Sequence, residues 1–175
     1  MCGVGLIVAN SIVTPPSPAR RSDVFVAAVP LRATKGPPQL VLSTAYSLNL
    51  SWDLQHFMVL SISIHLPSQV LVFDFQPQDT ESISVALAAL SGRKIPVLRT
   101  MRTRKMKNLP KMRCWRVGSC NVDVEEVMRK FNSSWDTDLI VGLHDCRHYT
   151  NGLVECLTGE KHVLDRLRRS QKSVV

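Results

Sequence analysis

Two apolar runs joined by a short connection constrain the fold of this chain more than any other feature. Residues 54–64 are rich in β-branched and aromatic residues and alternate with serine near their end, and residues 70–75 are also apolar. Both compositions are typical of β-strands. Because the connection is short and contains Pro67, we expect the two strands to pair as an antiparallel hairpin.

Other segments have strand or helix signals. Residues 23–31 are rich in Val and Phe and are closed by Pro30, which indicates a strand. The clearest helix signal starts near Asp145 and stops at Gly159, and a second starts at Asn121 or Asp123 with an acidic first turn. Further candidates are strands at 39–43, 113–118 and 138–141, a helix at 79–92 and a basic final helix from residue 163.

Strands that pair as hairpins, with helices between them, favour an α+β fold with an antiparallel sheet over a doubly wound parallel sheet. The 175 residues, 45% of them hydrophobic and 21% charged, are typical of one compact domain. We expect a flexible N-terminal segment at residues 1–22 and a single domain at residues 23–170. No apolar run approaches the roughly 18 residues of a membrane span, so we expect none.

Positive charge is concentrated in one segment. The chain has 22 basic and 14 acidic residues, and ten of the basic residues, with no acidic residue, lie in a basic segment at 93–116. Clustered Lys and Arg side chains bind phosphates and an aromatic ring stacks on a base, so this segment is a candidate site for nucleic acid or an acidic protein partner. Its candidate binding residues are Arg102, Arg104, Lys105 and Trp115. Nucleic acid is not favoured, because no recognised nucleic-acid module accompanies them.

The five cysteines favour an intracellular protein with reduced thiols, in the cytoplasm. Their number is odd and no two have the Cys-x-x-Cys spacing of a zinc site, so we expect no disulfide framework, no metal and no other cofactor. An organelle is the alternative compartment. The first 22 residues contain Arg20, Arg21 and several Ser and Pro residues but no acidic residue, which is compatible with a transit peptide.

The helix predicted from Asp145 begins with a cysteine. Cys146 lies in its expected first turn, where backbone N–H groups and the helix dipole stabilise a thiolate. A nucleophilic thiolate needs a base, usually histidine, and a group that orients the base. His56 on the first hairpin strand and Asp74 on the second are candidates for these roles, and His65 in the connection is the alternative third residue.

A purely structural interpretation of these residues stays open at this point. Cys146, Tyr149 and Leu153 share one face of the predicted helix, so Cys146 can instead begin a buried apolar stripe. His56 can be a hydrogen-bonded sheet residue, and Asp74 can be a polar residue at the end of the hairpin.

The sequence Asp-Cys-Arg-His-Tyr-Thr-Asn at 145–151, with Leu-Thr-Gly-Glu-Lys at 157–161, resembles the nucleophile helix of circularly permuted papain-like thiol enzymes. Two branches are similar: the PPPDE isopeptidases, which remove ubiquitin-like modifiers, and the lecithin:retinol acyltransferase-like family. The Leu-Thr-Gly sequence is closer to the PPPDE branch. Both branches have a catalytic histidine on an early strand and a late cysteine, which is the order of His56 and Cys146. The resemblance covers residues 55–76 and 135–161.

The resemblance implies a nucleophile-bearing helix packed on an antiparallel sheet, and a cysteine hydrolase acting on an amide, isopeptide or ester bond. The substrate would be a protein or an acyl compound, including a ubiquitin-like modifier, and acyl transfer is the alternative reaction. A non-catalytic interaction domain of the same fold is the alternative function. Asp145 stands where these families usually have Asn, and a carboxylate beside the nucleophile opposes thiolate formation.

Overall fold

The computed structural model describes residues 21–30, 55–67, 69–77, 82, 84, 85, 88, 91–97, 101–104 and 113–172. The strands are β1 (Ser22–Pro30), β2 (Gln55–Ser63), β3 (Val70–Asp74), β4 (Ile95–Pro96), β5 (Met101–Arg104), β6 (Cys114–Cys120) and β7 (Asp138–Leu139). The helices with assigned bounds are α3 (Val124–Ser134), α4 (Cys146–Thr158) and α5 (Val163–Lys172). The predicted strand at 39–43 lies outside the described residues, as does most of the predicted helix at 79–92.

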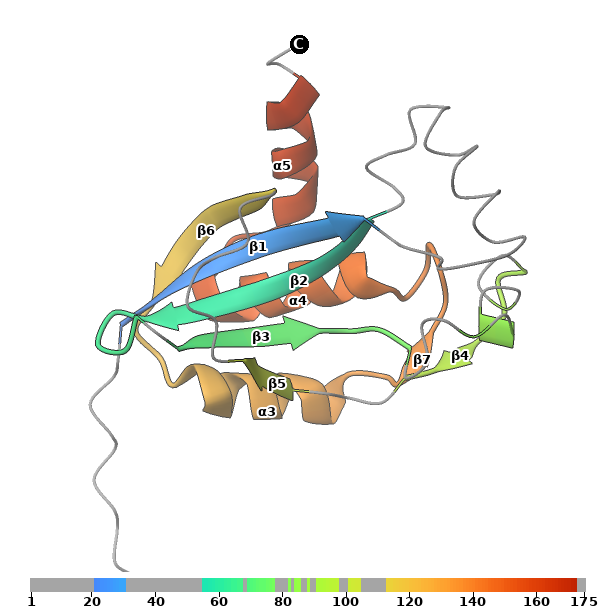
Figure 1. The fold of residues 1–175 in the computed structure, drawn as a ribbon, viewed down its shortest axis with the longest axis horizontal. Helices are drawn as coiled ribbons and strands as arrows, with labels where there is room; N and C mark the ends of the chain where they lie inside the picture. The colour runs from blue at the N-terminus through green and yellow to red at the C-terminus, as the bar shows by residue number, and fades with distance from the viewer. Residues whose placement is uncertain are drawn as a thin grey trace, which may run out of the picture.

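The main sheet has five strands in the order β5-β3-β2-β1-β6, and a small second sheet pairs β4 with β7 (Figure 1). The predicted hairpin is confirmed, because β2 and β3 pair antiparallel with Met58 opposite Asp74. β1 lies antiparallel between β2 and β6, and its register with β6 shifts between Val24 and Phe25. The α+β class and the antiparallel sheet are therefore as predicted from the sequence.

The basic segment 93–116 contains strands that the sequence analysis did not predict. β5 adds to the sheet beside β3, with Arg102 opposite Val72 and Arg104 opposite Val70, and β4 pairs with β7. β5 is the last strand on its side of the described sheet. Edge strands commonly carry charged residues, which discourage pairing with other molecules. The apolar residues of this segment are scattered among basic ones, so its sequence has no strand pattern. β5 could not be predicted for this reason, and it forms by pairing with β3.

The capping signals predicted the two central helices correctly. The Asp123 side chain accepts hydrogen bonds from the backbone N–H groups of Glu125 and Glu126 in the first turn of α3. Asp145 caps the start of α4, and Gly159 ends α4 with a φ of 77°, a left-handed conformation that glycine adopts without strain. Both ends of the helix that carries Cys146 are thus determined by local sequence.

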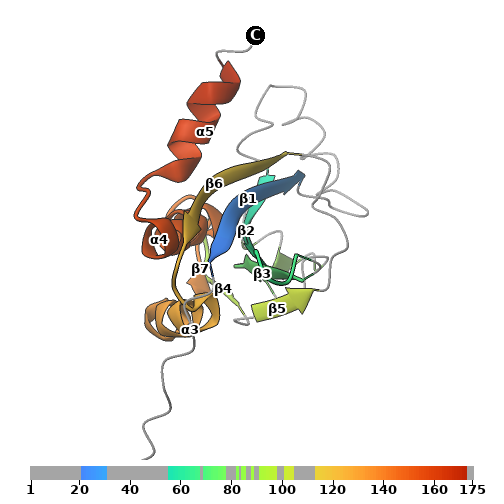
Figure 2. The same cartoon turned by 90° about the vertical axis from the view of Figure 1, so that its left-hand side faces the viewer.

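α3, α4 and α5 lie on the same side of the sheet (Figures 1 and 2). The main core forms between them and the sheet, where Leu153 and Val154 of α4 are fully buried with strand residues such as Val59. A second apolar cluster contains the strand residues that alternate with those of the main core: Ala27, Leu60, Val70 and Val72. Packing of α4 across the inner strands brings its first residue to the end of the sheet where β2 begins.

Candidate active site

His56 and Asp74 lie next to each other at one end of the hairpin. Asp74 is opposite Met58, two residues from His56, so the two residues are diagonal neighbours on paired strands. The distance between His56 Nε2 and Asp74 Oδ2 is 3.7 Å, which permits electrostatic attraction but exceeds hydrogen-bond length. The exposed fractions are only 8% for His56 and 9% for Asp74. Among the described residues, His56 Nε2 and Asp74 Oδ1 have no hydrogen-bond partner, so this buried pair retains unused polar atoms.

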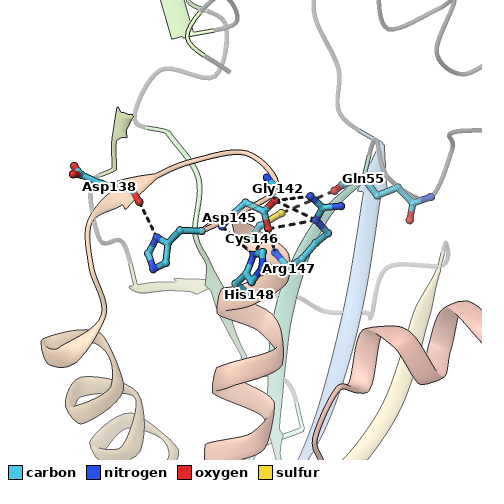
Figure 3. A network of polar contacts seen from close by, with 8 residues as sticks. Gln55, Asp138, Gly142, Asp145, Cys146, Arg147 and His148 are labelled. Carbon is cyan, nitrogen blue, oxygen red and sulfur yellow. Dashed lines mark hydrogen bonds and ion pairs between the residues drawn. The ribbon is translucent and has the colours of Figure 1, made fainter. Parts of the chain in front are cut away.

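Cys146 is the first residue of α4 and lies against the start of β2. Its sulfur is 4.0 Å from the backbone carbonyl oxygen of Gln55, the residue before His56. Figure 3 shows the sulfur directed toward that carbonyl, while the Gln55 amide side chain points away. The Cys146 side chain is half-buried, packs against the main core and interacts with the His56 ring. The structure therefore brings Cys146, His56 and Asp74 together from one helix and two strands.

The two neighbours of the His56 ring control its charge. Burial lowers the pKa of His56, but interactions with the side chains of Asp74 and Cys146 outweigh burial and raise the pKa to about 9. His56 is therefore an imidazolium at neutral pH. A nucleophilic cysteine needs an adjacent histidine and a group that orients this histidine, and the arrangement supplies both.

We expect the protonated His56 to stabilise the fold, and we expect this stabilisation to be lost in alkaline solution. The pKa of His56 is about 9 in the folded protein and 6.5 without these neighbours. Its contribution to stability is therefore fully present below about pH 6.5 and is lost as the pH rises through about 9. Denaturant unfolding at pH 6, 8 and 10 should show the stability difference between wild type and His56→Gln shrinking by about 1–3 kcal/mol. A difference that stays constant over this range would contradict the expectation.

Asp145 presents its carboxylate to the first turn of α4. Oδ1 accepts a hydrogen bond from the Arg147 backbone N–H at 3.0 Å, and Oδ2 accepts one from the Gly142 N–H at 2.8 Å. The Arg147 guanidinium lies 2.7 Å from Oδ2, and His148 Nδ1 lies 3.0 Å from Oδ1 (Figure 3). Burial raises the pKa of Asp145, but hydrogen bonds from Arg147 and Gly142 outweigh it and hold the pKa well below its usual range. His148 completes the capping box at the start of the helix.

The chain that leads into α4 is held by the loop after β7. Ile140 and His144 form an antiparallel bridge, and His144 Nδ1 lies 2.7 Å from the carbonyl oxygen of Asp138. The His144 ring stacks on Trp135, with 4.7 Å between ring centroids. These contacts hold the loop that contains Gly142. The Gly142 N–H donates a hydrogen bond to Asp145, so the loop supports the residue that caps α4.

Aromatic rings join the end of β3 to α4. Phe75, which follows Asp74, stacks on Tyr149 with 5.4 Å between ring centroids. The Tyr149 hydroxyl donates a hydrogen bond to Asn132 Oδ1 at 3.0 Å. Burial and then the Asp74 charge raise the pKa of Tyr149, so its hydroxyl stays neutral. The stack holds the strand end that carries Asp74 against the helix that carries Cys146.

The other predicted residues lie elsewhere. His65 is exposed in the turn at the opposite end of β2, so Asp74 and not His65 is the neighbour of His56. Arg102 and Arg104 are in β5 at one edge of the sheet, and Trp115 is in β6 at the other edge. Lys105 lies outside the described residues. The strands that carry the candidate binding residues of the basic segment are therefore separated by the width of the sheet.

The other described cysteines have different surroundings from Cys146. Cys114 and Cys120 lie in β6, and Cys156 is exposed on α4. Burial raises the pKa of each of these three thiols. Of the four cysteines in the described part of the chain, only Cys146 begins a helix and interacts with a histidine.

No group of three His, Cys, Asp or Glu residues in the described part of the chain is arranged to hold a metal ion. No helix in this part of the chain combines the length and the apolar character that a membrane span requires.

Arg147 and Gly142 both hold the Asp145 carboxylate, a role that was not predicted from the sequence. Arg147 lies two residues after the capping aspartate, and this spacing is a sequence signal for the ion pair between them. Gly142 has a φ of 84°, so its contact depends on a turn that glycine favours, and that turn was not predicted.

Comparisons of this chain with known protein families, with curated proteins and with solved structures found no match.

Proposed function

We propose that this chain is a cysteine-dependent hydrolase in which Cys146 is the nucleophile, His56 transfers the proton and Asp74 orients His56. The observation that carries the proposal is the buried His56–Asp74 pair beside the first residue of α4. Burying two ionisable groups is costly, and the cost is larger when polar atoms of the pair have no hydrogen-bond partner. Perturbed ionisable groups of this kind cluster at functional sites, which supports a catalytic role.

The chemistry uses two steps. The Cys146 thiolate attacks the carbonyl carbon of an amide, isopeptide or ester, and the His56 imidazolium protonates the leaving amine or alcohol as its bond to that carbon breaks. The product is a thioester on Cys146 and a neutral His56. A water molecule then gives a proton to His56 while its oxygen attacks the thioester, and release of the carboxylic acid restores the thiolate and the imidazolium.

The start of α4 supplies hydrogen-bond donors for the developing oxyanion. The first N–H groups of a helix have no partner within the helix, and they carry the positive end of its dipole. The Asp145 carboxylate occupies the N–H of Arg147. The N–H of Cys146 itself is next to the sulfur and is the group we assign to the oxyanion.

The permuted papain-like fold, with the PPPDE family as the closer branch, is part of this proposal. An antiparallel sheet, an early histidine strand and a late cysteine helix packed on that sheet support it. The proposed substrate is a protein or an acyl compound, including a ubiquitin-like modifier. The proposed compartment is a reducing intracellular one, in agreement with the free state of the four described cysteines.

One observation favours a second candidate, a non-catalytic interaction domain with this fold. The Cys146 side chain is only partly exposed and packs against the main core, as a structural cysteine does. Reactivity of the thiol separates the two candidates, because a structural cysteine is inert whereas a thiolate beside an imidazolium is not.

Limited alkylation followed by peptide mass mapping tests the proposal. Iodoacetamide at neutral pH should modify Cys146 at least about tenfold faster than Cys114, Cys120 or Cys156. Acylation by p-nitrophenyl acetate should give a burst of p-nitrophenol that Cys146→Ser abolishes. Cys156→Ser removes an exposed thiol from the same helix and should leave the burst unchanged. Uniform modification of the thiols without a burst would overturn the hydrolase and favour the interaction domain.

A further inference from the structure

The Asp145 carboxylate is an unusual group to find beside a nucleophilic cysteine. Its side chain is only 7% exposed, and it precedes Cys146 directly in the chain. A negative charge close to a thiol opposes formation of the thiolate. A neutral asparagine caps a helix equally well, so capping alone does not require a charged residue at this position.

The Arg147 side chain provides the opposite charge. Its Nη2 lies 2.7 Å from Asp145 Oδ2, and its Nε lies 3.2 Å from Oδ2 and 3.4 Å from Oδ1. These three contacts place the planar guanidinium along the carboxylate in a paired, fork-like geometry. The Arg147 backbone N–H also binds Oδ1, so one residue holds both oxygens of the cap.

Arg147 suits this role better than His148, the other residue whose side chain contacts the Asp145 carboxylate. The His148 side chain is 45% exposed, and its Nδ1 accepts the Asp145 backbone N–H in the capping box. The Arg147 side chain is 29% exposed, and a guanidinium stays charged at every physiological pH. Among the described residues, the His56–Asp74 pair on the sheet also lies beside Cys146, and His144 lies on the loop that leads into α4.

We infer that Arg147 is a positioning residue of the candidate site, whose guanidinium neutralises the Asp145 carboxylate so that an aspartate can cap the nucleophile helix without suppressing the Cys146 thiolate. This inference rests on the proposed function of Cys146. It assigns a role to the departure from the asparagine expected at position 145.

The rate of Cys146 alkylation by iodoacetamide as a function of pH tests the inference, because the rate follows the thiolate whether or not turnover occurs. In Arg147→Gln, the midpoint of the rate profile should move up by about one pH unit, so alkylation at neutral pH should slow by about tenfold. Arg147→Lys keeps the charge and should recover most of the wild-type profile. The double variant Asp145→Asn with Arg147→Gln should return the midpoint close to that of wild type.

Two controls define the result that would overturn the inference. Arg166→Gln removes the same charge from an exposed ion pair between Arg166 of α5 and Glu160, which follows the C-terminal end of α4. This substitution should leave the midpoint unchanged. Far-UV circular dichroism and thermal unfolding show whether each variant is folded. An unchanged midpoint in folded Arg147→Gln, or a double variant as impaired as the single one, would overturn the role of Arg147.

The outcomes for Arg147 and for the hydrolase are distinguishable. Failure of the hydrolase appears in the wild type, as slow alkylation of Cys146 and no burst with p-nitrophenyl acetate. Failure of the Arg147 inference appears only in the comparison of variants, as a pH profile that does not depend on the cap charges. If Cys146 is slow in the wild type and the profiles of all variants coincide, both are wrong.

Discussion

His56→Gln should lower the rate of thioester formation at Cys146 by about 10²–10⁴-fold, the range typical of removing a general acid–base residue. Glutamine retains bulk and polarity but can neither carry the proton nor present a positive charge to the sulfur. The size of the p-nitrophenol burst and its rate constant, measured with p-nitrophenyl acetate at pH 7, give this value directly. Alkylation of Cys146 should slow in the same variant, because its thiolate loses the adjacent imidazolium.

His65→Gln is the matched control for this prediction. His65 lies in the exposed turn at the other end of β2, so the same substitution there should leave the burst and the alkylation rate as in wild type. If His56→Gln and His65→Gln have equal rates, His56 is a structural residue of the sheet and the proposed mechanism is wrong.

Asp74→Asn should lower the same rate by about 10²–10⁴-fold, by analogy with the loss of the orienting carboxylate from a Ser-His-Asp triad. The amide has the shape of the carboxylate but not its charge, and Asp74 Oδ2 is the atom that faces His56 Nε2 at 3.7 Å. Loss of this charge should also lower the pKa of His56, because interaction with Asp74 raises it in the wild type. The burst rate should therefore begin to fall at a lower pH in Asp74→Asn than in the wild type as the solution is made more alkaline.

Asp23→Asn provides the corresponding control for Asp74→Asn. Asp23 is a more exposed aspartate on β1 whose carboxylate lies 2.8 Å from Arg116, far along the strand from the part of β1 that pairs with His56. Its replacement should change neither the rate nor the pH profile. A folded Asp74→Asn variant with the wild-type profile would remove Asp74 from the mechanism while leaving Cys146 and His56 in place.

Several elements could be predicted from the sequence because their causes are local. The β2–β3 hairpin follows from two apolar strands with a short connection, and α3 and α4 begin at aspartates that accept hydrogen bonds from their first turns. β5 could not be predicted in this way. Its residues have no strand pattern of their own. The strand forms because it pairs with β3, which is distant from it in the chain.

The candidate site divides in the same manner. A cysteine at a helix start, a histidine on one hairpin strand and an aspartate on the other could be named from residue types, spacing and a family resemblance. Their meeting depends on the packing of α4 across the inner strands, which the residue pattern does not encode, because Cys146 and His56 are distant in the chain and join only through the core. The same is true of the charge on Asp145. The sequence shows an aspartate next to the nucleophile, whereas its effect depends on Gly142, Arg147 and His148, and electrostatic interactions follow distances in space rather than positions along the chain.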